Sequence, residues 1–157
     1  MNVYLVQHAE AKSKQEDPSR PLSDLGRTNI RKVASYLADH AEVELDSVYH
    51  SGKTRALETA EVLRRHLHPR NGLHQAEGLQ ALDDPKIWAN KLSETKAEVM
   101  LVGHLPHLSK LAATLVCNDP DRKVIDFQNA GVVCIGKDDD SKGKWSVRWI
   151  ITPHIVG

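Results

Sequence analysis

The sequence predicts an α/β protein in which a mostly parallel β-sheet lies between two layers of helices, a three-layer αβα arrangement. Short apolar segments alternate with amphipathic helical segments through residues 1–117, which is the pattern of repeated strand–helix units. Two strand-like segments close the chain and predict a C-terminal antiparallel hairpin. The length of 157 residues fits one domain over residues 1–157, with enough buried surface for a core.

The first strand is predicted over residues 2–6, where a continuous apolar run ends abruptly in polar residues. Residues 9–21 are polar and irregular, so we expect a loop. A helix follows over residues 23–40, because apolar residues recur there at helical spacing and Ser23 suits the N-cap. The chain therefore leaves its first strand through a long polar loop.

The middle of the chain repeats the strand–helix order. Residues 47–49 predict a short strand, and residues 53–67 predict a helix with its apolar positions on one face. A further helix is expected over residues 84–92, with Asp84 as the N-cap before a proline at the first helical position. Residues 98–102 are again an apolar strand.

The last third of the chain contains one more helix and the hairpin. The helix is predicted over residues 106–117, and the hairpin strands over residues 132–135 and 145–151. Trp145 and Trp149 alternate with polar residues in the last strand. We expect both rings on one face of that strand, in a structural role.

The composition excludes several classes of function. Lysine plus arginine and aspartate plus glutamate both number 21, so the chain lacks the basic excess of a nucleic-acid binder. No apolar run approaches the ~20 residues that span a bilayer, and the N-terminus lacks the pattern of a secretory signal. Cys117 and Cys134 are too few for a disulfide framework and are expected to be small buried side chains. We therefore expect a cytoplasmic protein that binds neither nucleic acid nor membrane.

Three side chains follow the predicted strands at the points where a parallel sheet binds its ligands. His8 lies two residues past the first strand, and His104 lies two residues past the strand at 98–102. Arg55 lies in the first turn of the helix that follows the strand at 47–49. Because ligands of open α/β sheets bind beyond the carboxyl ends of the strands, we expect these three side chains at one edge.

Two imidazoles and a guanidinium suit phosphoryl transfer. A neutral imidazole is a nucleophile that can carry a phosphoryl group. Arginine offers a planar fork of donors to phosphate oxygens, and a helix N-terminus adds free N–H groups. A protonated second histidine would donate to the oxygens that gain charge in the transition state.

Four short motifs then resemble those of the histidine phosphatase superfamily, which has the phosphoglycerate-mutase-like fold. They are LVQHAE at residues 5–10, RPLSDLG at 20–26, SGKTRALETA at 51–60 and VGH at 102–104. Their order, their spacing and the short chain are similar to the SixA-like phosphohistidine phosphatases. The resemblance extends from residue 1 to about residue 115.

The resemblance implies a role for each of the three residues at the predicted edge. His8 would attack phosphorus and become transiently phosphorylated, while Arg55 and His104 would hold the phosphoryl oxygens. Water would then hydrolyse the phosphohistidine. No metal or organic cofactor is implied.

Two residues of the implied phosphate pocket leave alternatives open. Gln7 stands where the family usually has arginine, and its amide would assist as a neutral donor in a slower or retuned enzyme. Arg20 would line the pocket, and the alternative is a surface ion pair with Glu16 or Asp17.

The general acid is the least defined part of the predicted site. Glu77, Asp83 and Asp84 are the nearby carboxylates, and Asp83 is preferred because Asp84 is expected to cap a helix. An imidazole leaving group has a conjugate acid with a pKa near ~6.5, so it needs a proton donor less than a sugar alkoxide does. A weak acid therefore favours P–N over P–O substrates.

Pairs of histidines also occur outside the predicted site. His104 with His107 and His66 with His68 could suggest a metal, but a catalytic zinc normally has three protein ligands. We expect no metal site, and we expect His107, His66 and His68 on helix surfaces.

The sequence thus predicts a phosphohistidine phosphatase that acts on a phosphorylated protein, such as a signalling phosphotransfer domain. The chain lacks the long insertion that covers the site in larger sugar-phosphate relatives, so an open site would accept a protein surface. Two alternatives remain: a catalytically degenerate module that binds phosphate or phosphoprotein, and a small-molecule phosphomonoesterase.

Overall fold

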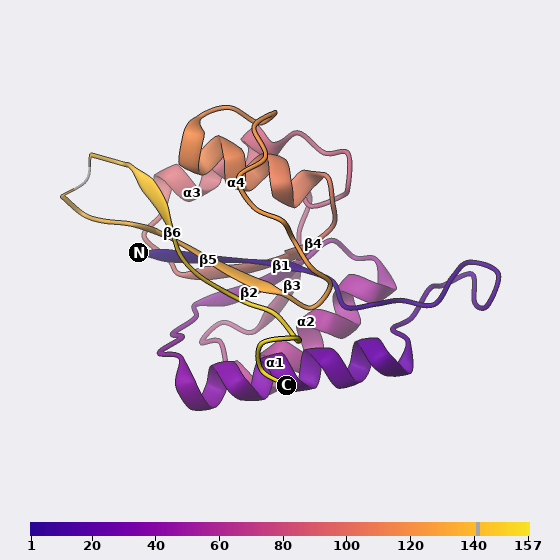
Figure 1. Ribbon diagram of the computed structural model, residues 1–157. Helices are drawn as coiled ribbons and strands as arrows, with labels where there is room; N and C mark the ends of the chain where they lie inside the picture. Colours follow the sequence, from indigo (N-terminus) through magenta and orange to yellow (C-terminus); the bar gives the residue numbers. More distant parts are fainter. Residues whose placement is uncertain (141) are drawn as a thin grey trace.

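The computed structural model describes residues 1–140 and 142–157, and all its strands form one sheet (Figure 1). In chain order the elements are β1 (Asn2–Gln7), α1 (Asp24–His40), β2 (Ser47–His50), α2 (Thr54–Leu67), β3 (Leu73–Gln75), α3 (Pro85–Glu94), β4 (Val99–Gly103), α4 (His107–Cys117), β5 (Val132–Lys137) and β6 (Trp145–Ile151). The six strands are ordered β3-β2-β4-β1-β5-β6. The strands β1 to β4 run parallel, and β5 and β6 add the antiparallel hairpin, so the predicted α/β class is confirmed.

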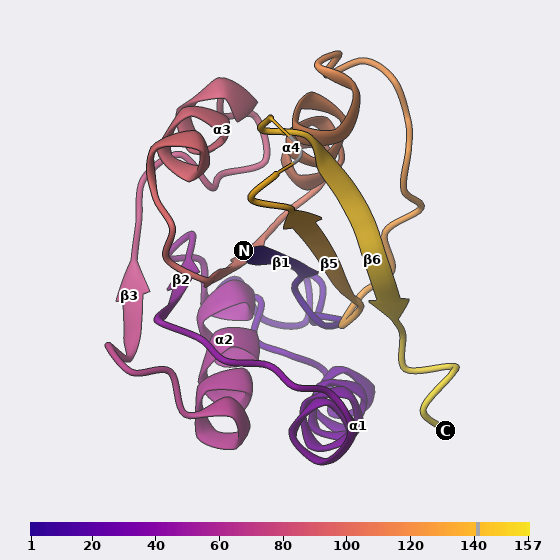
Figure 2. The ribbon, with the colours of Figure 1, turned by 90° about the vertical axis from the view of Figure 1, so that its left-hand side faces the viewer.

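Alternate residues of β1 pack into two separate cores. Tyr4 and Val6 face the layer of α1 and α2, whereas Val3 and Leu5 face the layer of α3 and α4. Figure 1 shows these two helical layers on opposite faces of the sheet. Figure 2 shows them from the side, with β3 and β6 at the two edges. Because both faces of β1 are covered, its sequence is a continuous apolar run rather than an alternating one.

The sheet has a switch point between its two central strands. β1 pairs in parallel with β4, in a register that matches Gln7 with Gly103. The helix after β1 covers one face of the sheet, and the helix after β4 covers the other. Adjacent strands whose connections leave to opposite faces open a crevice at their carboxyl ends. His8 and His104 follow these two strands directly.

Most predicted elements lie within two residues of their observed bounds, but β3 is missing from the prediction. Its three residues contain one apolar side chain, which is too little for a strand signal. Ser23 caps α1 as expected, because its side chain accepts a hydrogen bond from Gly26 N. Cys134 is buried as predicted, whereas Cys117 is only partly buried. Among the described residues no helix is long and apolar enough to cross a membrane.

The expectation that Trp145 and Trp149 share one face of the last strand is wrong. The register between β5 and β6 shifts between Cys134 and Ile135, which leaves one extra residue in β6. Trp145 therefore packs in the core beneath α3 and α4, whereas Trp149 packs against the core of α1 and α2. A bulge turns every later residue of the strand to the opposite face of the sheet. The alternation of apolar and polar residues in the sequence does not reveal the bulge.

His107 was expected on the surface of a helix and is instead fully buried at the start of α4. Neither ring nitrogen has a hydrogen-bond partner among the described residues. Burial lowers the pKa of His107, although the negative charges of Asp83 and Asp84 oppose this effect. His107 is therefore a neutral ring within the core, next to the helix start that follows His104.

The buried neutral state of His107 predicts that acid destabilises the protein. Below the ordinary histidine pKa of 6.5 the unfolded chain gains a proton that the folded ring does not accept. Stability is therefore lost as the pH falls from 6.5 toward the lowered pKa. In urea unfolding, the free energy of unfolding should fall less for a His107→Leu variant than for the wild type between pH 7.5 and 5.5. The difference should reach up to about 1.4 kcal/mol.

The control for this experiment is His154→Leu, which removes an exposed histidine. It should follow the pH dependence of the wild type. Equal pH slopes for His107→Leu and wild type would show that His107 does not resist protonation.

Candidate active site

His8 is held in one tautomer at the carboxyl end of β1. Its backbone N–H donates to Gly103 O at 3.1 Å, which extends the pairing of β1 with β4 by one residue. Its ring Nδ1 lies 2.7 Å from Ala9 O. A carbonyl oxygen only accepts, so Nδ1 carries the proton and Nε2 keeps its lone pair. Burial and the positive charge of Arg55 lower the pKa of His8, so the ring is neutral at pH 7.

The turn after His8 is fixed from two sides. Asn129 Nδ2 donates to His8 O at 2.9 Å, from the segment that precedes β5. Ala9 N donates to Thr59 Oγ1 at 3.0 Å, and that hydroxyl donates to Arg55 O at 2.7 Å. The first turn of α2 is thereby tied to the turn that carries His8. This arrangement brings Arg55 to the same edge as His8, as the strand-exit rule predicts.

His104 stacks obliquely beside His8 at the end of β4. The two ring centroids are 5.1 Å apart and the planes are inclined by 53°. His104 is only 3% exposed, and burial, with smaller contributions from His8 and Arg55, lowers its pKa to about 3. In the free protein His104 is therefore neutral at pH 7, and not protonated as the sequence analysis expected. The ring of His104 can therefore offer a hydrogen bond but no positive charge.

Two arginines supply positive charge to the site, and the charge of Lys53 also reaches His104. Arg20 lowers the pKa of both His8 and Arg55 through its charge, which places it within their electrostatic reach. Its Nε donates to a backbone oxygen of its own loop at 3.0 Å. In residues 1–140 and 142–157 no ion pair involves Arg20, so the alternative pairing with Glu16 or Asp17 is not formed.

Buried polar atoms without a partner gather at this edge. Among the described residues they are Gln7 Oε1, Arg55 Nε, His104 Nδ1 and the two ring nitrogens of His107. Three of these four residues belong to the predicted phosphate pocket. Buried polar groups normally have a hydrogen-bond partner. Unpartnered donors that lie beside arginines are suited to bind an oxyanion. Gln7 places its amide oxygen at the buried position, and rotation of the amide group would present the NH₂ donor instead.

Asp83 lies in the segment between β3 and α3, and it exchanges hydrogen bonds locally with Gln80. Its carboxylate accepts from Gln80 N at 2.9 Å. The Gln80 side chain donates to Ser51 O at 2.6 Å, and Ser51 Oγ lies 2.6 Å from His104 Nε2. The segment that carries Asp83 is thereby fastened to the site, while a catalytic role for Asp83 stays a prediction.

Four residues that support the site were missed in the sequence analysis. Ser51 and Thr59 are the serine and threonine of the motif at residues 51–60, so the motif contained a signal for both. Gln80 and Asn129 have no local signal, because their contacts bridge distant parts of the chain.

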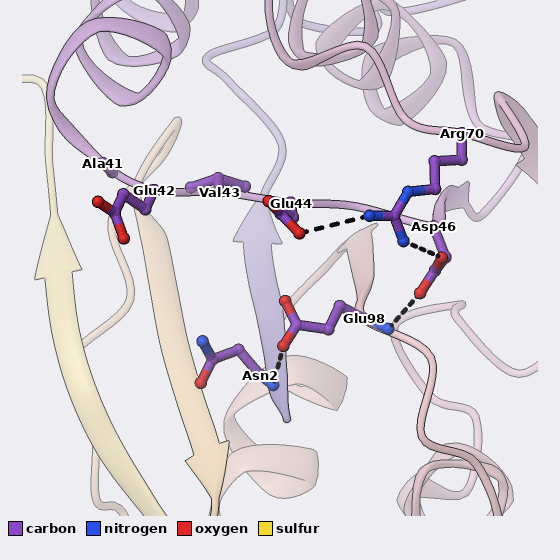
Figure 3. A pocket seen from close by; sticks show the side chains of 8 residues that line it. All are labelled: Asn2, Ala41, Glu42, Val43, Glu44, Asp46, Arg70 and Glu98. Atoms are coloured by element: carbon purple, nitrogen blue, oxygen red, sulfur yellow. Dashed lines mark hydrogen bonds and ion pairs between the residues drawn. The ribbon is translucent and has the colours of Figure 1, made fainter.

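Two other kinds of site come into question, a metal site and a cavity at the opposite end of the sheet. In the part of the chain that the structure describes, no three His, Cys, Asp or Glu side chains are placed to hold a metal. A cavity of about 600 Å³ lies at the amino ends of β1, β2 and β4 (Figure 3). Its lining is Asn2, Ala41, Glu42, Val43, Glu44, Asp46, Arg70 and Glu98.

The charged groups of that cavity bind one another. Arg70 pairs with Glu44 at 3.3 Å and with Asp46 at 3.2 Å. The other oxygen of Asp46 accepts from Glu98 N at 2.8 Å, and Glu98 accepts from Asn2 N at 3.1 Å (Figure 3). These bonds tie together the starts of three strands. An acidic lining at the wrong end of the sheet does not suit a phosphate, so the site at His8 is the candidate.

Comparisons with known proteins place the same fold in a family of phosphatases. The family model of the histidine phosphatase superfamily (branch 1) matches residues 3–83 of the sequence. The structure of the protein histidine phosphatase SixA complexed with tungstate is 24% identical, covers 100% of both chains and has a TM-score of 0.85. The α-ribazole phosphatase from Shigella flexneri is 15% identical over 98% of this chain and 97% of its own, with a TM-score of 0.78.

A third solved structure with this fold is that of a phosphatase bound to a different phosphorylated compound. The phosphoserine phosphatase mutant from Entamoeba histolytica, in complex with phosphoserine, is 13% identical over 95% of both chains, with a TM-score of 0.68. A comparison with curated protein sequences gave no significant match. The matched family region contains the strand that ends before His8, the loop of Arg20 and the helix start of Arg55. The chain belongs to the histidine phosphatase superfamily, branch 1.

Proposed function

We propose that this protein removes a phosphoryl group from phosphohistidine on another protein, through a covalent intermediate at His8. The observation that carries the proposal is the tautomer of His8. Its Nδ1–H is committed to Ala9 O, so Nε2 offers a lone pair beside Arg55 and Arg20. A neutral imidazole in a cationic surrounding is suited to attack an anionic phosphoryl group.

The reaction has two displacement steps. His8 Nε2 forms a bond to phosphorus while the P–N bond of the substrate breaks, and the substrate imidazole leaves with the electron pair and takes up a proton. Water then attacks the phosphorus of phospho-His8, which releases inorganic phosphate and restores the free ring. Arg55 and Arg20 balance the negative charge of the phosphoryl oxygens in both steps.

The substrate class rests on the leaving group and on the rim of the site. A phosphohistidine releases an imidazole, whose departure needs less help from an acid than that of an alkoxide. Leu82, next to Asp83, is 89% exposed, and Leu105, next to His104, is 39% exposed. Apolar side chains beside the site favour contact with a protein surface over a small polar ester. The SixA name among the structural neighbours supports the same substrate class.

Two alternative functions are each favoured by one observation. A phosphate-binding module without turnover is favoured by Gln7, since a neutral amide replaces the arginine of the family. A small-molecule phosphomonoesterase is favoured by the α-ribazole and phosphoserine phosphatases among the neighbours. Both alternatives use the same pocket. The binding module would release no phosphate, whereas the phosphomonoesterase would release phosphate and an alcohol.

We predict that the purified protein releases phosphate from a phosphohistidine-containing protein and that Gln7→Arg is faster. A charge-assisted hydrogen bond is worth ~1.5–3 kcal/mol, which corresponds to roughly a 10–150-fold gain in kcat/KM. His8→Ala should release no phosphate above background. An exposed change, His154→Ala, serves as the matched control and should behave as wild type.

The outcomes separate the three functions. Binding of the phosphoprotein without release would establish the binding module and contradict the proposed reaction. Faster hydrolysis of a sugar phosphate than of phosphohistidine would establish the phosphomonoesterase. A Gln7→Arg rate equal to or below wild type would show that the amide is not what limits the rate.

We predict that Asp83→Asn distinguishes substrates by their leaving groups. General-acid catalysis is worth about 10²–10⁴-fold for a leaving group that needs a proton. Turnover of a phosphomonoester should fall in that range, while turnover of phosphohistidine should fall by less than about tenfold. Equal losses on both substrates, measured as kcat/KM, would mean that Asp83 is not the acid.

A further inference from the structure

The hydroxyl group of Ser51 contacts the ring of His104 inside the protein. Ser51 lies between β2 and α2 and is 1% exposed, and His104 is 3% exposed. Ser51 Oγ is 2.6 Å from His104 Nε2. Both groups are shielded from water, so the direction of this hydrogen bond is fixed by the protein.

The remaining contacts of Ser51 determine that direction. Lys53 N–H donates weakly to Ser51 Oγ at 3.4 Å, which uses the oxygen as an acceptor. The hydroxyl proton still needs an acceptor, and within residues 1–140 and 142–157 the only one in contact is His104 Nε2. The hydroxyl therefore donates to Nε2. A neutral imidazole with an acceptor at Nε2 carries its proton at Nδ1.

His104 Nδ1 is buried and has no hydrogen-bond partner in the part of the chain that the structure describes. In this tautomer it is an N–H group free to donate, beside the ring of His8 at a centroid distance of 5.1 Å. The opposite tautomer would direct a lone pair at the oxygens of a bound phosphoryl group and repel them. The two histidines thus share a tautomer and differ in the atom they offer: His8 its Nε2 lone pair, His104 its Nδ1 proton.

Ser51 is itself held by the segment before α3. Gln80 Nε2 donates to Ser51 O at 2.6 Å, and Gln80 N donates to Asp83 Oδ2 at 2.9 Å. The position of the serine therefore depends on the same segment that carries the candidate acid.

We propose that Ser51 is a positioning residue that fixes His104 as the Nδ1–H tautomer, so that His104 donates a neutral hydrogen bond to the transferring phosphoryl group. The catalytic part of this proposal rests on the proposed function, whereas the tautomer does not. The lowered pKa of His104 agrees with a ring that stays neutral.

The test is the ¹⁵N spectrum of histidine-labelled protein, with the His104 signals assigned by their loss in His104→Gln. Long-range ¹H–¹⁵N correlations distinguish a protonated from an unprotonated ring nitrogen. In wild type we expect a protonated Nδ1 and an unprotonated Nε2, unchanged from pH 5.5 to 8.5. In Ser51→Ala the Nε2–H tautomer should become populated, and in Ser51→Thr, which keeps the hydroxyl, the wild-type pattern should remain.

An Nε2–H tautomer in wild type, or an unchanged pattern in Ser51→Ala, would overturn the proposal. The wild-type spectrum decides the tautomer even where a variant does not fold. Ser93→Ala, an exposed serine in α3, is the matched control and should leave the His104 signals in place.

The kinetic arm measures phosphate release and is independent of the spectra. Loss of one positioned hydrogen bond should lower kcat/KM of Ser51→Ala by about tenfold, with Ser51→Thr less affected. Failure of the proposed function would remove phosphate release in wild type as well, while the spectra would still report the tautomer. A shifted tautomer in Ser51→Ala with unchanged kcat/KM would contradict the catalytic role of the serine.

Discussion

The parallel pairing of β1 with β4 is the constraint on which the site depends. These two strands lie at the centre of the sheet, and their register continues past Gln7 and Gly103 through the bond from His8 N to Gly103 O. Their connections leave to opposite faces, which opens the crevice between them. A shift of this register by one residue would turn the side chains of β1 to the other face and separate His8 from His104.

The site combines neutral imidazoles with charged guanidinium groups. Burial keeps His8 and His104 unprotonated, while Arg55 and Arg20 hold the positive charge. This division suits a covalent mechanism, since a protonated His8 would have no lone pair with which to attack. It also has a cost for the fold, because several buried polar atoms have no hydrogen-bond partner within residues 1–140 and 142–157. The stability lost at such atoms is consistent with a site built to bind an anion.

The sequence alone predicts the fold class, and it predicts that His8 and His104 lie at the same edge of the sheet. His8 and His104 could be found because each directly follows an apolar strand, and parallel strands deliver such residues to one edge. The contacts around them could not be predicted, because Ser51 reaches His104 across 53 residues and Gln80 reaches Ser51 across 29. His107 was assigned to the surface because helical periodicity is weak at the first residue of a helix, where the preceding turn decides what is buried.

In the proposed mechanism one atom, His8 Nε2, accepts the phosphoryl group. The most direct test is to react the protein briefly with a radiolabelled small phosphoramidate, quench it in alkali and map the label. We expect the label on His8 at Nε2, and we expect it to disappear with time in water. A label at Nδ1 or on His104, or phosphate release from a protein that never carries the label, would contradict it.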